Sequence, residues 1–343
     1  LGDDASPEVM RPTLDIIESM HLGIDFHYPA VGPDAEKATG SLFPEQSKQA
    51  IDAADATLFG STSGHSTAAL FYLRWGKQTF ANVRPSQWLP GYASPMARPE
   101  GIDFVIVREN LEDLYLGLEG DLEDLAALNY YSRHARASLA DLGPGKYAIK
   151  AITERGSERV IRHSFDLARR RDQKRKVTVT CKYNMLSTAD GLFLETAKRV
   201  ANDYPDIAFE HFIVDDFLCR MIAQPEELDV IVTPNLYGDI LSDGAAGMMG
   251  GLGLAPSGCY GDDYAYFESA HGTAPDIAGQ NIINPTATLL SAAMMLDYLN
   301  LREAALRLRH AVRSVYSEGR TLPRDQGGTA STDAFCEAVR SLL

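Results

Sequence analysis

Cysteine is scarce in this sequence, with four residues among 343. They lie far apart in the chain, at Cys181, Cys219, Cys259 and Cys336. This spacing matches neither a zinc-binding motif nor the disulfide framework of a small secreted domain. We therefore expect reduced thiols and a cytoplasmic protein.

Long hydrophobic runs are absent as well. The longest apolar stretch, around residues 286–296, is interrupted by Ser291 and ends at Asp297. It falls well short of the ~18–20 residues that a membrane-spanning helix needs. The first residues carry neither the basic segment nor the apolar core of a signal peptide. We therefore expect no export and no membrane partner.

Positive charge is in the minority, because 32 Lys and Arg residues stand against 47 Asp and Glu residues, giving a net charge of −15. Affinity for nucleic acid draws on a broad basic surface, so we expect no nucleic-acid partner. A focused basic pocket for a small anion is still compatible with this balance. The length predicts about two domains of ~150 residues each.

The two common phosphate-binding glycine motifs are also missing. No G-x-x-x-x-G-K-[ST] motif occurs, and the glycine-rich run 250–258 lacks the G-x-G-x-x-G spacing. That run neither follows a clear strand nor opens a clear helix, as a dinucleotide-binding loop would. The sequence therefore argues against a Rossmann fold.

The sequence does contain short β-branched runs that alternate with amphipathic segments, which predicts an α/β fold. A first helix is expected to begin at Ser6-Pro7-Glu8, with Ser6 as the N-cap. The basic run 169–176 is expected to close another helix, where positive charge faces the helix dipole. The runs that predict buried strands are residues 56–60, 104–107, 177–180 and 230–232.

Two further segments have turn character. Residues 147–152 and 158–161, joined through Arg155-Gly156-Ser157, predict a projecting hairpin. Residues 271–279 combine turn residues with a histidine and an aspartate, and they predict a loop followed by an N-capped helix.

Three of the predicted strands end in polar residues, at Arg108-Glu109-Asn110, Lys182-Tyr183-Asn184 and Asn235 to Asp239. In open α/β sheets the chemistry collects at the carboxyl ends of the strands. The three strand ends taken together predict that these polar residues line one shared cleft. The alternative for each strand end taken singly is ordinary loop polarity.

Asp239 and Asp243 are four residues apart, so on a helix both carboxylates project from one face. Mg²⁺ or Mn²⁺ prefers such oxygen ligands, and the acidic pair Asp215-Asp216 could add a third carboxylate. The alternative is a helix N-terminus whose acids match the dipole.

Arginine is the residue best suited to hold a carboxylate through two hydrogen bonds. Arg74, Arg84 and Arg108 lie beside predicted strand or helix ends. A cluster of these three would trap a di- or tricarboxylate on an acidic protein. The alternative is three separate surface ion pairs.

Three motifs carry a resemblance to a known family: Asn235-Leu236-Tyr237-Gly238-Asp239-Ile240-Leu241-Ser242-Asp243, His271-Gly272-Thr273-Ala274-Pro275-Asp276-Ile277-Ala278-Gly279, and Leu73-Arg74 with Phe80-Ala81-Asn82-Val83-Arg84-Pro85. From Asp3 to its end the chain resembles the β-decarboxylating dehydrogenases, which act on isopropylmalate, isocitrate, homoisocitrate, tartrate or D-malate. The resemblance implies an α/β, isocitrate/isopropylmalate dehydrogenase-like fold with two domains and mixed sheets. It divides the chain into a cofactor-side domain of residues 1–81 and 250–343 and a substrate, metal and dimerisation domain of residues 82–249, with an arm around 145–163.

The resemblance also implies roles for residues of this chain. Tyr115 would protonate the enol, and Lys182 would act as the base on the substrate hydroxyl. In the family, Lys182 and Asp215 reach into the cleft of the partner subunit, which implies a homodimer with shared active sites. The substrate-binding residues would be Arg74, Arg84, Arg108, Leu70 and Phe71, and the metal ligands Asp215, Asp239 and Asp243.

The implied cofactor is NAD. Asp276 can accept hydrogen bonds from the ribose hydroxyls and would repel a 2′-phosphate. NADP-using relatives place Lys and Tyr at positions 276 and 277. The other residues expected around the cofactor are Glu268, His271, Gly272, Thr273, Ala274 and Asn284.

Two departures bear on these roles. Residues 2–9 read Gly-Asp-Asp-Ala-Ser-Pro-Glu-Val where the family has Gly-Asp-Gly-Ile-Gly-Pro-Glu-Val, so two glycines are replaced near the cofactor. Isocitrate enzymes carry Ser and Asn where Ala68 and Leu70 stand. Leu70 and Phe71 form an apolar wall closer to an isopropylmalate pocket, although the acid typical there is replaced by Thr67.

We therefore take 3-isopropylmalate as the first candidate substrate, oxidatively decarboxylated with NAD and Mg²⁺ or Mn²⁺. Isocitrate, homoisocitrate, tartrate and D-malate are the alternatives. A non-catalytic regulatory subunit is a further alternative, but such subunits tend to lose the Tyr, the Lys or a metal Asp, and Tyr115, Lys182, Asp239 and Asp243 are all present.

Overall fold

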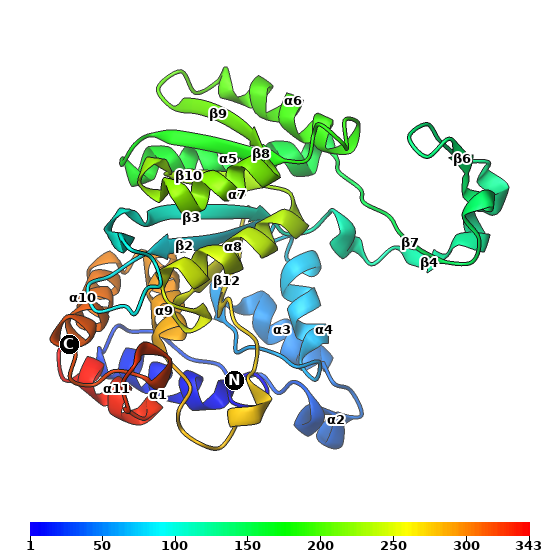
Figure 1. Ribbon diagram of the computed structural model, residues 1–343. Helices are drawn as coiled ribbons and strands as arrows, with labels where there is room; N and C mark the ends of the chain where they lie inside the picture. Colours follow the sequence, from blue (N-terminus) through cyan, green and yellow to red (C-terminus); the bar gives the residue numbers. More distant parts are fainter.

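The computed structural model describes all 343 residues and has one eight-stranded mixed sheet at its centre (Figure 1). The strand order is β1-β12-β11-β2-β3-β10-β8-β9. Strands β3, β10, β8 and β9 are parallel to one another, whereas β2 is antiparallel to both of its neighbours. The strands are β1 (Ala56–Leu58), β2 (Ala81–Gln87), β3 (Asp103–Glu109), β8 (Lys176–Cys181), β9 (Ala208–Ile213), β10 (Val230–Thr233), β11 (Pro256–Tyr260) and β12 (Ala265–Ser269).

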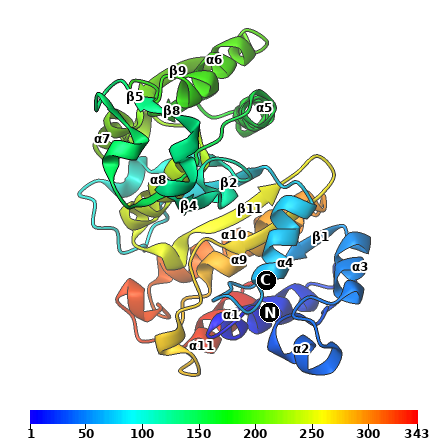
Figure 2. The same cartoon turned by 90° about the vertical axis from the view of Figure 1, so that its right-hand side faces the viewer.

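Helices cover both faces of the sheet, and Figure 2 shows α5 and α7 on opposite sides of the upper strands. Helix α5 packs on β10 and β3, and α8 packs on β3 and β2. The helices are α1 (Ser6–Ser19), α2 (Pro33–Thr39), α3 (Glu45–Ala53), α4 (Thr67–Phe71), α5 (Glu154–Arg171), α6 (Ala189–Ala201), α7 (Val214–Ala223), α8 (Asn235–Met249), α9 (Thr286–Tyr298), α10 (Arg302–Glu318) and α11 (Thr332–Arg340). No helix is both long and apolar enough to cross a membrane.

The predicted strands at 104–107, 177–180 and 230–232 are confirmed as β3, β8 and β10. Their consecutive apolar residues are buried because helices cover both faces of this part of the sheet. The predicted strand at 56–60 forms as β1, but it lies at the edge of the sheet and is half-buried rather than buried.

The projecting arm lies elsewhere than predicted. Strand β4 (Glu119–Asp121) pairs with β7 (Lys146–Ala148), and β5 (Tyr131–Ser132) pairs with β6 (Ala137–Ser138), in a segment that extends from the body in Figure 1. The expected hairpin of 147–152 with 158–161, and an arm reaching to residue 163, are therefore wrong. Residues 154–171 form α5.

The sequence of α5 explains this outcome. The Thr153 hydroxyl caps the helix by accepting a hydrogen bond from the Gly156 N–H at 3.0 Å. Val160, Ile161 and Phe165 are fully buried at helical spacing along one stripe. The helix ends in the basic run at Arg171, as predicted.

Two predicted helix starts also need correction. Helix α1 has Ala5 at its N-cap position, and Ser6, predicted as the cap, is its buried first residue. Residues 271–279 form a loop, as predicted, with a single turn η8 (Pro275–Ile277). The helix that follows, α9, begins only at Thr286 after Pro285, whose side chain has no capping acceptor.

The sheet is continuous across the predicted domain boundary at residues 81 and 82. Strand β2 pairs with β11 on one side and with β3 on the other, so no linker separates the two groups of elements. The division into two domains stays a prediction.

Helix α8 approaches β3 closely at Gly238. A Cβ atom added there would lie 2.6 Å from Arg108 Cβ and Cγ. Neither atom is the far end of a flexible side chain, so the backbone of α8 or β3 must shift to admit a methyl group.

We predict that Gly238→Ala lowers the free energy of unfolding by ~1–3 kcal/mol, the usual cost of overpacking. Urea denaturation followed by circular dichroism measures it. The control is Gly191→Ala in α6, where an added Cβ meets no atom within 4 Å. Equal effects of the two substitutions would contradict the packing argument.

Candidate functional site

The three predicted strand ends meet at one edge of the sheet, because β3, β10 and β8 are parallel neighbours. Helix α8 begins directly after β10 and runs over β3 and β2. Asn235, its first residue, accepts a hydrogen bond from Arg108 Nε at 2.8 Å. This bond connects the start of α8 to the end of β3.

Two of the predicted arginines converge on the predicted aspartates. Arg84 on β2 donates through Nη1 to Asp239 Oδ1 at 3.1 Å and lies 3.4 Å from Asp243 Oδ1. Arg108 on β3 donates through Nη1 to the same oxygen of Asp239. Ser242 Oγ accepts a further hydrogen bond from Arg84 at 2.7 Å. The structure therefore forms a cluster, rather than separate surface ion pairs, from Arg84, Arg108, Asp239 and Asp243.

Tyr115 belongs to the same cluster. It lies in a single turn, η3 (Leu114–Leu116), and its hydroxyl donates to Asp239 Oδ2. The Arg108 guanidinium lies over its ring, 4.7 Å from the centroid. Asp239 thus has one oxygen on the two arginines and the other on Tyr115.

Two buried donors of this cluster have no partner. Arg84 Nε and Arg108 Nη2 are shielded from solvent and make no hydrogen bond within the chain. Buried N–H groups are almost always paired in folded proteins. An anionic ligand at the cluster would supply the missing acceptors.

The charged groups of this cluster shift one another's pKa values. Burial raises the pKa of Asp239, but Arg108 and Arg84 outweigh it and hold the pKa below its usual value. Burial and the neighbouring Asp239 raise the pKa of Asp243. Burial, then the charge of Arg84, lowers the pKa of Arg108 to about 10. Burial and Asp239 raise the pKa of Tyr115, which keeps its proton at neutral pH.

Arg74 is held by a different pair of groups. Its Nε donates to the Tyr266 hydroxyl at 3.2 Å, and its Nη2 lies 3.7 Å from Glu268 Oε1. Glu268, expected beside the cofactor, is thus the ionic partner of Arg74 in this chain.

Lys182 and Asp215 form their own pair, with Lys182 Nζ 2.5 Å from Asp215 Oδ1. Lys182 follows β8, and Asp215 lies in the first turn of α7. Lys182 holds the pKa of the Asp215 carboxyl below its usual value. No group of three Asp, Glu, His or Cys side chains in one chain is arranged to hold a metal ion. Asp215 therefore does not join Asp239 and Asp243 within one chain.

The predicted apolar wall is only partly exposed. Phe71 is half exposed on α4, with its ring edge-on to Trp75 at 5.1 Å. Leu70 is half-buried against a small apolar cluster that includes Leu73 and Tyr266.

The predicted cofactor residues lie mainly in the loop after β12. His271 Nε2 is buried there without a partner, and burial lowers the pKa of this histidine, so the ring is neutral at pH 7. Gly272 and Asp276 are exposed, while Ala274 has a left-handed φ of 48°. Asn284 lies apart from that loop, where its amide contacts Asp325 at 3.0 Å.

The altered N-terminal turn contacts this loop. Asp4 stands where the family has glycine, and it adopts the left-handed φ of 52°. Its Oδ2 accepts a hydrogen bond from Thr273 Oγ1 at 2.7 Å. The Ala5 N–H donates to the Thr273 carbonyl at 3.1 Å. Although the two glycines are replaced, the N-terminal turn still forms direct hydrogen bonds with the loop after β12.

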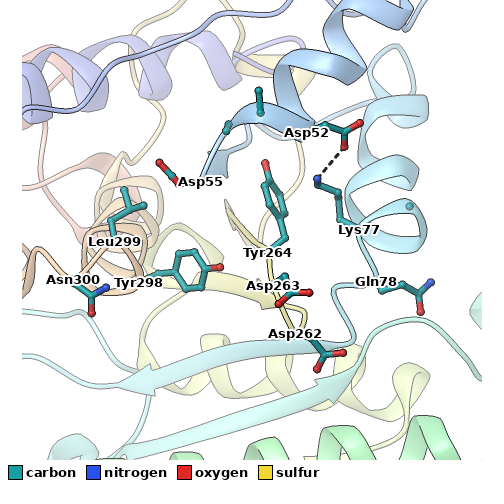
Figure 3. A pocket seen from close by; sticks show the side chains of 13 residues that line it. Asp52, Asp55, Lys77, Gln78, Asp262, Asp263, Tyr264, Tyr298, Leu299 and Asn300 are labelled. Carbon is teal, nitrogen blue, oxygen red and sulfur yellow. Dashed lines mark hydrogen bonds and ion pairs between the residues drawn. The ribbon is translucent and has the colours of Figure 1, made fainter.

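A cavity that none of these residues lines lies elsewhere in the molecule (Figure 3). Its volume is about 1010 Å³, and it opens beside the turn between β11 and β12. An ion pair of Lys77 with Asp52 at 2.9 Å closes one side. It is not the predicted site. Its lining residues are Asp52, Ala53, Ala54, Asp55, Gly76, Lys77, Gln78, Asp262, Asp263, Tyr264, Tyr298, Leu299 and Asn300.

Three residues that contact the arginines were not assigned a role from the sequence. Asn235 and Ser242 lie inside a quoted motif, so their type and spacing were available as a signal. Tyr266 lies in no motif, and its contact with Arg74 joins residues 192 positions apart in the chain.

The mixed sheet has the α/β fold of the isocitrate dehydrogenases, and the arginine–aspartate cluster lies at its edge. A crystal structure of isocitrate dehydrogenase from Methylococcus capsulatus matches with a TM-score of 0.84 and 35% identity, over 99% of this chain and 97% of that chain.

This chain belongs to the isocitrate/isopropylmalate dehydrogenase family, whose profile matches residues 1–339. A Methanocaldococcus jannaschii relative, 3-isopropylmalate/3-methylmalate dehydrogenase, is 40% identical over 98% of this chain and 96% of its own length. A Thermus thermophilus relative, isocitrate/homoisocitrate dehydrogenase, is 42% identical over 100% of this chain and 96% of its own length.

Glu109, directly after Arg108, generates a pH-dependent prediction. Its side chain is 2% exposed, and burial raises its pKa from 4.5 to about 7. The raised pKa means that the neutral form stabilises the fold. This contribution is fully present below pH 4.5 and is lost as the pH rises through about 7.

We predict that Glu109→Gln removes this contribution, so that the stability difference between parent and variant changes by about 1 kcal/mol between roughly pH 6 and pH 8. Urea denaturation at the two pH values measures it. Glu303→Gln, at an exposed position of α10, serves as the control. A pH-independent difference for Glu109→Gln would contradict the prediction.

Proposed function

We propose that this protein catalyses the NAD-dependent oxidative decarboxylation of a 2-hydroxy-3-carboxy acid with a bound divalent metal ion, and that 3-isopropylmalate is the first candidate substrate. The observation that carries the proposal is the pair of buried, unpartnered donors Arg84 Nε and Arg108 Nη2 beside Asp239. These donors match the planar oxygens of a substrate carboxylate.

The metal ligands would be Asp239 and Asp243, with Asp215 from a partner subunit. An all-carboxylate set suits a hard cation such as Mg²⁺ or Mn²⁺. Asp239 fits this role because its pKa is held low, so it is ionised at neutral pH. When bound, the metal would act as a Lewis acid on the substrate oxygens.

Proton transfer is assigned to Lys182 and Tyr115. Lys182 would leave the ion pair that it makes with Asp215, give up its ammonium proton to water, and as the neutral amine accept the proton of the substrate hydroxyl. Tyr115 holds its hydroxyl proton at neutral pH, because burial and Asp239 raise its pKa. It can therefore donate this proton to the enol carbon once carbon dioxide has left.

The cofactor residues fit a nicotinamide dinucleotide, which would accept the hydride. The buried His271 Nε2 has no partner in the chain, and the exposed Asp276 is free to meet ribose hydroxyls. The charge of Asp276 would repel a 2′-phosphate, which favours NAD over NADP.

We also propose a homodimer. Lys182 and Asp215 contact each other and not the cluster around Asp239 in a single chain. A second copy would bring these two residues to the cluster and complete the metal site.

A second candidate substrate is isocitrate or homoisocitrate, favoured by the Thermus thermophilus relative of that name at 42% identity. The apolar side chains of Leu70 and Phe71 favour 3-isopropylmalate instead. A pocket of this kind separates close analogues by only ~1–3 kcal/mol per methylene.

The test is NADH formation with Mn²⁺ across five acids: 3-isopropylmalate, isocitrate, homoisocitrate, tartrate and D-malate. We expect turnover with at least one, and with 3-isopropylmalate before the others. Each acid is also tested with NADP in place of NAD. Turnover with none of them would refute catalysis, and faster turnover with NADP would refute the argument from Asp276.

We predict that Lys182→Ala lowers the rate of hydride transfer by about 10²–10⁴-fold, the usual contribution of a positioned acid or base. Single-turnover NADH absorbance measures it. Lys198→Ala, an exposed lysine of α6 that pairs with Glu195, is the matched control. A Lys182→Ala variant with parental single-turnover rates would show that another group is the base.

A further inference from the structure

One ammonium group lies between the segments that carry Tyr115 and Lys182. Lys150 precedes α5, and its side chain is 14% exposed. Its Nζ is 2.7 Å from Asp190 Oδ1 and 3.4 Å from Asp113 Oδ1. It also lies over the ring of Tyr237, 4.3 Å from the centroid.

Asp190 supports the backbone at Lys182. It lies in the first turn of α6 and is fully buried. Its Oδ2 accepts a hydrogen bond from the Lys182 N–H at 2.7 Å, while its other oxygen faces Lys150. The direction in which the Lys182 side chain leaves the sheet therefore depends on Asp190.

Asp113 supports two other parts of the site. It is fully buried and has a left-handed φ of 68°, an uncommon conformation for a residue with a side chain. Its Oδ1 accepts from the Leu114 N–H at 2.9 Å, next to Tyr115, and its Oδ2 accepts from the Leu236 N–H at 3.0 Å, in the first turn of α8.

Lys150 is the one cation in contact with either carboxylate. Two ionised carboxylates that are buried side by side are strongly destabilised unless a positive charge is paired with them. The ammonium therefore holds Asp113 and Asp190, and through them the backbone of three segments, in one arrangement.

We propose that Lys150 is a positioning residue for the reaction. It holds the backbone segments that carry Lys182 and Tyr115, and so keeps both side chains oriented toward the substrate. It touches neither substrate nor cofactor in this assignment, and the inference rests on the proposed function. Displacements of about 1 Å at a catalytic group cost of the order of 10²-fold in rate, which is the scale of effect expected here.

The test compares Lys150→Met, which keeps the length of the side chain and removes its charge, with Lys150→Arg, which keeps the charge. We expect Lys150→Met to lower kcat at least about tenfold with KM within about threefold, and Lys150→Arg to recover most of the rate. Lys198→Met in α6 is the matched control and should behave like the parent.

Two readouts separate positioning from a loss of folded protein. The deuterium isotope effect on kcat/KM, measured with substrate labelled at the carbon that gives up the hydride, should rise in Lys150→Met, because hydride transfer becomes slower relative to binding. A smaller folded fraction leaves this ratio unchanged. Amide hydrogen exchange at Lys182, Leu114 and Leu236 should become faster in Lys150→Met but not in Lys198→Met.

The inference is overturned if Lys150→Met is folded, turns over within twofold of the parent and shows parental amide exchange and isotope effect. If Lys150→Met does not fold, Lys150→Gln, whose amide still donates a hydrogen bond, is judged by the same criteria. A parent without activity on any of the five acids refutes the proposed function alone, because the exchange measurement still decides whether Lys150 holds these segments.

Discussion

The buried guanidinium of Arg108 is the group on which the arrangement of the site depends. Its side chain is 2% exposed, and it contacts the first residue of α8, the carboxylate of Asp239 and the ring of Tyr115. Gly238 allows the helix to come this close to β3. A charge buried to this degree is stable only when it is paired and hydrogen-bonded, so the positions of α8 and Tyr115 are set by the need to satisfy it.

Much of the fold could be predicted because the central strands carry a strong local signal. Continuous runs of β-branched or aromatic residues occur at 104–107, 177–180 and 230–232. Such runs are typical of buried strands and not of helices. The hairpin predicted at 158–161 is wrong because the apolar residues of α5 are sparse among charged ones. Their helical spacing becomes clear only when Val160, Ile161, Phe165 and Ala168 are viewed as one stripe.

Some residues of the candidate site could likewise be predicted from the sequence and others could not. Residues within contiguous motifs, such as Asp239 and Asp243, could be predicted from type and spacing. Lys150 and Tyr266 could not, because their partners lie far along the chain and contact them only in the folded structure. Asp4 shows a third case, in which the departure from the family is visible in the sequence but its contact with Thr273 is not.

The pairing of β11 with β2 has a mechanical consequence. Only three residue pairs, from Ala81–Tyr260 to Val83–Gly258, join the strands that carry Arg84 and Arg108 to those that carry the loop at His271. Within the sheet, no flexible linker runs beside these three pairs. Rotation of one end of the sheet against the other would therefore have to twist these three hydrogen-bonded pairs.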